Sequence, residues 1–267
     1  MRAFLACFLA LAACSSDSDN TTNPPPPGDD MPPDGSDMPP PTTDPSVRQD
    51  YDDTASIIAT HLNVAEIAAM KASVDLSYGR VPAGMAEDVA GGLASGTGSL
   101  SGSIAGLAYS LAFECHDPAH VAIPCNGAED HVRVVVKYSG ATSGANMAMD
   151  GINEKGVFYV RYVNTGKPMY GGTGQNAFTS TLSTGVYTVS YQESSLHLQF
   201  DPTTPTLPSM GTYDLTLTMH RTRDGVADRD FNVSAHLEVT GADAAVLTLD
   251  NQEVYNLTLS TGVAVHQ

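Results

Sequence analysis

Alternation between polar and apolar residues in the second half of the chain is the feature that most restricts its fold. Residues 185–191, 211–217 and 253–259 share one pattern, in which a tyrosine is followed at every second position by apolar residues. Successive side chains of a strand point to opposite faces, so this pattern places one face in a core and the other in water. Antiparallel sheets covered on one side have such sequences. We therefore expect a mainly β domain.

Further alternating segments precede these three, and short turns separate them. They comprise residues 99–104, 107–113, 132–138 and 157–163. The dipeptide Asp224-Gly225 lies between two alternating runs, and it favours the two-residue turn of a β-hairpin. We expect about ten antiparallel strands in a meander, folded as a curved sheet, an open barrel or a sandwich.

Residues 54–77 form the one convincing stretch with a helical repeat. Its apolar residues recur at spacings of three and four, which places Ile58, Leu62, Ala65, Ala69, Ala72 and Leu76 on one face. Asp53 or Thr54 can cap the start, and Tyr78-Gly79 can end the segment. The pattern Asn63-x-x-Glu66 is a variant of the capping box, so it predicts a break or a kink near Asn63. This short helical segment is expected to pack on the sheet.

The N-terminus reads as an export signal. Residues 1–13 begin with Met and Arg and continue as an apolar run, which is typical of a secretory signal peptide. The run ends in Leu11-Ala12-Ala13-Cys14, which resembles the lipobox of bacterial lipoproteins. The resemblance implies cleavage before Cys14 and lipidation of that cysteine. Because Ser15 rather than Asp follows, it also implies an outer-membrane location.

The residues after this signal have the composition of a tether. Residues 15–53 contain ten prolines and ten aspartates, and such a segment cannot bury enough apolar surface to fold. We therefore expect a signal peptide at 1–13, lipidated Cys14 and a disordered tether at 14–53, and a β-rich globular domain at 54–267.

Cysteine content and charge agree with a location in the cell envelope. Cys7 leaves with the signal and Cys14 is lipidated, so Cys115 and Cys125 remain and are expected to form a disulfide. The formal net charge of −18 and the lack of a basic patch argue against nucleic acid as a partner.

Two segments carry residue types that bind metals. His116, His120 and His131 lie close in sequence to the cysteine pair, and imidazoles are good ligands for Zn²⁺. Asp224, Asp228 and Asp230 alternate in a way that can supply oxygens to Ca²⁺. Neither segment completes a known metal motif, so a polar loop and a solvated hairpin tip are the preferred interpretations.

No catalytic motif occurs, so we expect no enzyme and no cofactor beyond a possible zinc or calcium ion. The leading hypothesis is a lipid-anchored envelope protein that displays a β-rich domain for structural, adhesive or ligand-binding use. Its expected partners are the membrane, through the anchor, and an envelope protein or a small molecule. One alternative is a metal-binding protein that uses the three histidines. Another is a carrier of an apolar ligand, in a cavity lined by Ile57, Ile58 and Leu62. The absence of Trp weakens a carbohydrate-binding function, although eleven Tyr can supply stacking surfaces.

Overall fold

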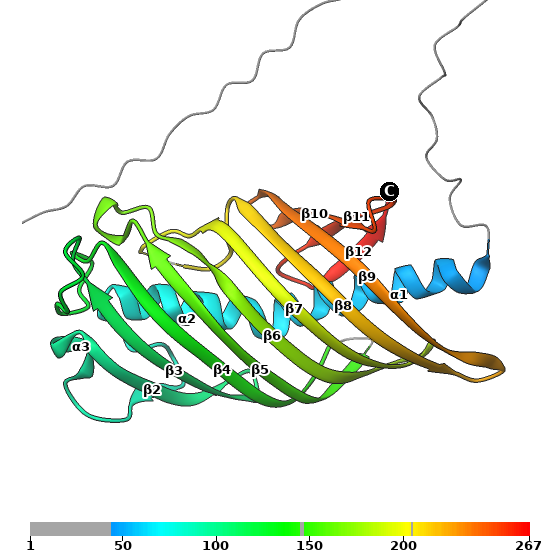
Figure 1. Ribbon diagram of the computed structural model, residues 1–267, viewed down its shortest axis with the longest axis horizontal. Helices are drawn as coiled ribbons and strands as arrows, with labels where there is room; N and C mark the ends of the chain where they lie inside the picture. Colours follow the sequence, from blue (N-terminus) through cyan, green and yellow to red (C-terminus); the bar gives the residue numbers. More distant parts are fainter. Residues whose placement is uncertain (1–43, 145–146, 204) are drawn as a thin grey trace, which may run out of the picture. The chain divides into compact units, whose positions relative to one another are not determined.

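A single antiparallel sheet dominates the molecule (Figure 1). The computed structural model describes residues 44–144, 147–203 and 205–267. Within these residues twelve strands follow one another in sheet order from β1 to β12, so every strand pairs with its neighbours in sequence. The predicted mainly β meander is confirmed as an open curved sheet, with twelve strands where about ten were expected.

The elements have the following bounds. The strands are β1 (Met85–Glu87), β2 (Thr97–Ile104), β3 (Leu107–His116), β4 (His131–Ser143), β5 (Met147–Arg161), β6 (Met169–Leu182), β7 (Gly185–Gln199), β8 (Gly211–Arg223), β9 (Val226–Gly241), β10 (Ala244–Leu249), β11 (Glu253–Thr258) and β12 (Val263–His266). The helical elements are α1 (Pro45–His61), the π-helical turn η1 (Leu62–Glu66), α2 (Ile67–Ser77), α3 (Gly92–Ser95) and the 3-10 turn η2 (Val163–Thr165).

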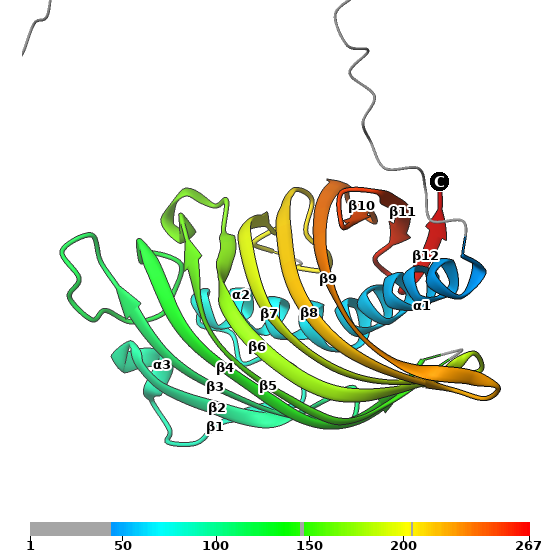
Figure 2. The same ribbon diagram turned by 45° about the vertical axis from the view of Figure 1, so that its right-hand side comes forward.

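The strands β4 to β9 are unusually long, and the sheet bends around the helical segment (Figure 2). Their pairing shifts in register at Gly140/Thr142, Asp150/Lys155 and Tyr170/Gly172. Such irregularities let a strand bend and twist more strongly than an ideal ladder permits. As a result α1, η1 and α2 lie along the concave side, and the convex side faces solvent.

The helical segment begins earlier than predicted. Its first residue is Pro45, and the Asp44 side chain caps it by accepting a hydrogen bond from the Ser46 N–H at 2.9 Å. Proline suits the first helical position because its φ is already fixed near the helical value. The predicted start at Thr54, and with it the boundary between tether and domain at residue 53, is therefore wrong.

Two aspartates of the predicted tether explain this difference. Asp50 and Asp53 are buried, and they face arginines of β8 and β9. Asp50 lies 2.9 Å from Arg221, 3.2 Å from Arg223 and 3.1 Å from Arg229, and Asp53 lies 3.1 Å from Arg223. These two aspartates, which were predicted to belong to a solvated tether, therefore fix the first turns of α1 to the sheet.

The break predicted near Asn63 does not occur, because the helix continues through this point; the irregularity there is the π-helical turn η1. Tyr78 caps the end of α2, and Gly79 follows with a φ of 69°. The hairpin predicted at Asp224-Gly225 joins β8 to β9, with Gly225 at a φ of 74°. No helix within the described residues is long and apolar enough to cross a membrane.

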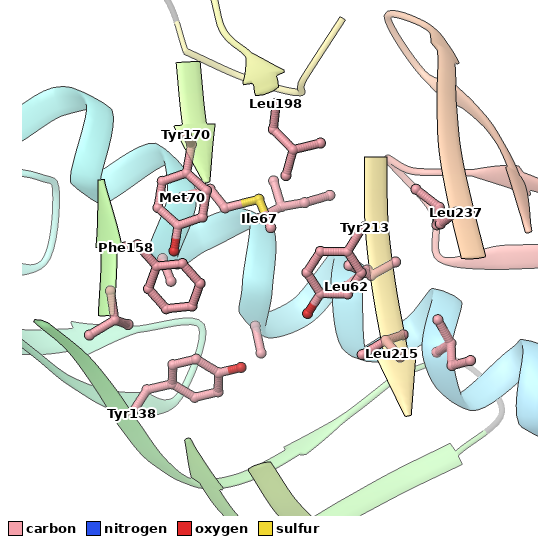
Figure 3. Packing of buried hydrophobic residues seen from close by; sticks show 14 of the residues in the cluster. Leu62, Ile67, Met70, Tyr138, Phe158, Tyr170, Leu198, Tyr213, Leu215 and Leu237 are labelled. Carbon is pink, nitrogen blue, oxygen red and sulfur yellow. The ribbon is translucent and has the colours of Figure 1, made fainter. Parts of the chain in front are cut away.

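The predicted alternation also places the core. The inward residues of β7 and β8, namely Tyr187, Val189, Tyr191, Tyr213, Leu215 and Leu217, are buried. They meet the apolar face of the helical segment, where Leu62, Ile67 and Met70 pack (Figure 3). Several tyrosines of this core turn their hydroxyl groups inward, so the interior is partly polar.

Candidate functional site

The three histidines predicted as metal ligands do come together. His116 ends β3 and His131 begins β4, where the two residues are register partners. The centroid of the His131 ring lies 5.2 Å from that of His116 and 5.2 Å from that of His120. The centroids of His116 and His120 are 6.4 Å apart. Cys115 and Cys125 lie at disulfide distance, with Cα atoms 5.6 Å apart, and they hold the loop that carries His120.

The histidine nitrogens nevertheless do not form a coordination sphere. The rings of His116 and His131 are stacked at 19°, so their in-plane lone pairs do not converge. His116 Nδ1 lies 3.3 Å from the His120 carbonyl oxygen, and His131 Nδ1 lies 3.2 Å from Asp130. A shared zinc ion would require these side chains to rotate.

The aspartates predicted as calcium ligands are not gathered at one point. Asp224 lies in the turn between β8 and β9, and Asp228 is exposed on β9. Asp230 faces His220 at 2.7 Å on the exposed side of the sheet. The described structure therefore supports a solvated hairpin tip at this position.

A continuous hollow runs along the convex face of β5 to β8, and we name it the outer furrow. Its walls and floor come from outward-facing residues, chiefly Tyr159, Arg161, Tyr162, Thr173, Gln175, Gln192, Ser194 and Thr216. Four adjoining hollows of about 410, 380, 610 and 440 Å³ compose it, and each shares residues with the next. Each volume lies in the range of about 300–1,000 Å³ that is typical of ligand sites.

Small residues on β6 make the furrow possible. Gly171 lies at the shift in register between β6 and β7, where an added Cβ would come within 2.8 Å of the Ser195 carbonyl oxygen. Glycine therefore lets the backbones of β6 and β7 approach closely at this part of the furrow. At one end the furrow opens toward His120 and His131.

Backbone strain is concentrated at this end of the furrow. Six non-glycine residues of the described chain have a positive φ, and three of them line the furrow: His120 at 60°, Tyr162 at 58° and His197 at 55°. This conformation is uncommon for such residues and often marks a functional site. Tyr162 is also 47% exposed, although it is a large aromatic side chain.

An arginine without an ion-pair partner lies at the same end of the furrow. The Arg161 guanidinium lies over the Tyr159 ring, 5.3 Å from its centroid. Within the described residues no carboxylate lies within ion-pair distance of Arg161. The neighbouring Tyr159, Tyr162 and Leu196 supply apolar surface. This combination can stack on a ring and donate hydrogen bonds to its substituents.

A second polar site is buried inside the sheet. Glu66 from η1, Glu154 from β5 and Glu193 from β7 place one oxygen each within 4.8 Å of one another. We name these three residues the interior carboxylate cluster. Within the described residues it is the one group of three His, Cys, Asp or Glu side chains with ligand atoms so close. Each of the three side chains is at least 96% buried.

Tyrosine hydroxyls surround this cluster. Glu66 accepts hydrogen bonds from Tyr138 and, at 2.8 Å, from Tyr191, while Glu193 accepts one from Tyr213. No hydrogen bond of good geometry reaches either oxygen of Glu154 or Oε1 of Glu193 in the described structure. The Asn176 amide and the backbone N–H groups of Lys155 and Gln175 lie nearby and partly offset the rise in the pKa of Glu154. Gly174 leaves the space for the two carboxylates, because an added Cβ would lie closer than 3.0 Å to both.

Burial controls the ionisation of the interior groups. Desolvation, together with the charge of Glu66, raises the pKa of Glu154, and desolvation raises the pKa of Glu66 and Glu193 as well. His61 lies 3.8 Å from Glu66, and burial lowers its pKa to about 3. His61 is therefore neutral at neutral pH and gives the carboxylates no positive partner.

This cluster was not predicted from the sequence, although the sequence contains a signal for it. Glu193 follows Tyr187, Val189 and Tyr191 at the same spacing of two, so it lies on the inward face. Glu154 lies four residues before Phe158 on β5, and this even spacing places it on the same inward face. A carboxylate at an inward position is a buried polar group that needs a partner. The meeting of β5, β7 and η1 could not be derived without the strand order.

The cavity expected for an apolar carrier is almost filled. It lies between helix and sheet and is lined by Ile57, Ile58, Leu62 and their neighbours, with a volume of about 10 Å³. This is about the smallest space that admits one water molecule. The structure thus offers no room there for an apolar ligand.

Comparison of the chain with protein-family models, curated proteins and solved structures finds no match. The candidate sites therefore rest on the geometry and chemistry of this chain.

Proposed function

We propose that this chain is a lipid-anchored cell-envelope protein whose β domain binds a neutral, hydroxyl-rich polysaccharide along the outer furrow. The observation that carries the proposal is the furrow itself, which extends across four adjoining hollows on the solvent face. An extended hollow suits an extended ligand. A single compact metabolite would fill one hollow and leave the others empty.

The lining of the furrow supports this ligand class. Gln175 and Gln192 are register partners on β6 and β7, so their amides lie side by side and can each donate and accept hydrogen bonds. Thr173, Ser194 and Thr216 add hydroxyl groups. Tyr159 and Tyr162 provide aromatic surface at one end, where Arg161 provides donors. The net charge of −18 opposes an acidic polymer, which favours a neutral one.

The anchor is proposed from the sequence alone. The lipobox-like Leu11–Cys14 supports attachment of Cys14 to the outer membrane, and both lie outside the described residues. Attachment of a binding domain at the membrane would hold envelope polysaccharide close to it. Two or more acyl chains give stable anchoring.

Affinity electrophoresis of the full chain tests this function. Gels would contain a neutral β-glucan, a mannan or a xylan, with a polyuronate as the acidic comparison. We expect retardation by at least one neutral polymer. The variant Thr173→Trp would fill the floor between two hollows and weaken binding at least about tenfold, which corresponds to about 1.4 kcal/mol.

The matched control is Thr240→Trp, which places the same side chain on an exposed position of β9 away from the furrow. It should bind as the unaltered chain does. Equal loss in the two variants, or no retardation by any neutral polymer, would contradict the proposal.

A second candidate function is zinc binding by His116, His120 and His131, and the closeness of their rings favours it. Rings bound to one zinc at about 2.0–2.1 Å have centroids about 5 Å apart, and His131 is 5.2 Å from each of the other two rings, which are 6.4 Å apart. Zinc calorimetry with His131→Ala would test it. A stoichiometric site lost in that variant supports it, and no heat from the unaltered chain contradicts it.

A further inference from the structure

The interior carboxylate cluster lacks a positive partner. Within the described residues no lysine or arginine lies within 4.0 Å of Glu66, Glu154 or Glu193, and the one nearby base is His61. The other polar groups around it are the hydroxyls of Tyr138, Tyr191 and Tyr213 and the amide of Asn176. Burying several unpaired carboxylates is strongly unfavourable, because each loses its hydration.

A group outside the cluster also points to a missing ligand. Tyr170 on β6 is 1% exposed, and its hydroxyl has no hydrogen-bond partner in the described structure. Figure 3 shows the hydroxyl oxygens of Tyr138, Tyr170 and Tyr213 directed into the same interior space. Buried hydroxyls are normally paired, so the unpaired Tyr170 hydroxyl, together with the unpaired oxygens of Glu154 and Glu193, indicates that this interior lacks a polar partner.

We propose that the interior carboxylate cluster binds one calcium ion. Its ligands are the Oε atoms of Glu154 and Glu193 that no hydrogen bond of good geometry reaches, together with Glu66. The three ligand oxygens lie within 4.8 Å of one another. Oxygens on opposite sides of Ca²⁺, each at about 2.3–2.6 Å, are about 4.6–5.2 Å apart, so one ion can reach all three.

The chemistry of the donor set favours calcium over zinc. The available donors are oxygens, which hard cations prefer. The two nitrogens of His61 already face other groups, since Nδ1 lies 3.2 Å from the Tyr191 hydroxyl and Nε2 lies 3.0 Å from Asn176. One divalent ion would reduce the interior charge of three carboxylates from −3 to −1.

The rival state is a cluster that holds protons in place of an ion. It predicts no calcium effect at any pH, whereas the cation site predicts that calcium competes with protons for the same oxygens. The full chain would be unfolded in urea with a chelator and refolded with or without CaCl₂ at pH 8, since the site is closed in the folded protein. Thermal unfolding and bound metal per chain would then be measured.

We expect about one Ca²⁺ per chain and a higher Tm in calcium, with Mg²⁺ less effective. Glu154→Gln keeps the shape of the side chain and removes a charged ligand, so it should weaken calcium binding at least tenfold and abolish the Tm shift. Asp228→Asn removes a surface carboxylate and is the matched control for loose binding to the acidic exterior. It should retain both effects.

Terbium luminescence keeps the proposal testable if Glu154→Gln does not fold. Tb³⁺ replaces Ca²⁺, and emission excited through tyrosine requires an ion close to a tyrosine ring, as Tyr138 and Tyr191 are to the cluster. Emission that calcium displaces from the unaltered chain and from Asp228→Asn supports the site. Absence of bound calcium together with absence of sensitised emission would overturn it.

Discussion

Gly174 is opposite Glu193 in the register of β6 and β7 and beneath Glu154. We predict that Gly174→Ala lowers the free energy of unfolding by about 1–3 kcal/mol, because the new methyl group overfills a closed interior. Urea denaturation measures the change.

The control for this substitution is Gly241→Ala. An added Cβ at Gly241 has no atom within 4 Å, so its effect should stay within about 0.5 kcal/mol. Equal destabilisation by the two variants would show that Gly174 is not confined by the carboxylates.

The interior carboxylates also predict how stability depends on pH. Desolvation raises the pKa of Glu66 to about 7, and desolvation with the charge of Glu66 raises that of Glu154 to about 10, against 4.5 for an ordinary glutamate. Above pH 4.5 the unfolded chain has released protons that the folded chain still holds. The free energy of unfolding therefore falls as the pH rises from 4.5 toward the pKa values of the folded chain.

The clearest range for this test is pH 8 to 9, because His61, with a pKa of about 3 in the folded chain and 6.5 in the unfolded chain, is almost fully deprotonated in both states there. In chelator, the midpoint of urea unfolding should fall across this range. Glu154→Gln should flatten the fall. A midpoint that rises with pH in the unaltered chain would exclude retained protons on the cluster.

At the scale of the element, α1 depends on its buried ion pairs. Asp50→Ala would leave Arg221 buried without its carboxylate, and breaking such a pair costs about 3–5 kcal/mol. We predict a loss of that size in chemical unfolding, with early exchange of α1 amides. Asp230→Ala breaks the exposed pair with His220 and should cost about 0–1 kcal/mol. Similar losses in the two variants would contradict the role assigned to Asp50.

The elements differ in how far the sequence predicts them. Alternation in 185–191 and 211–217 predicts β7 and β8 because one face meets a core and one meets water. The start of α1 was not predictable from its local pattern, since Asp50 and Asp53 belong to a proline- and aspartate-rich segment. Their arginine partners lie more than 160 residues away in sequence. The interior carboxylate cluster also depends on tertiary pairing, because Glu66, Glu154 and Glu193 come from η1, β5 and β7.

The helical segment fills the concave side of the sheet. The cavity between them holds about 10 Å³. We therefore predict that a hydrophobic fluorophore shows no enhanced emission with the native protein. It should respond once mild urea releases α1, and Asp50→Ala should lower the urea concentration required. Strong emission with the native protein would revive a carrier function.

The direction of the helical segment gives the domain two unlike poles. α1 begins beside the C-terminal strand β12, whereas the connection between β3 and β4, which carries His120, lies toward the opposite end of the sheet (Figures 1 and 2). The proposed N-terminal anchor would make the end of the domain where α1 and β12 meet the proximal pole, and the end that bears the imidazoles the distal pole. A bulky tag after Gln267 would crowd the proximal pole, while a tag between β3 and β4 would project from the distal one.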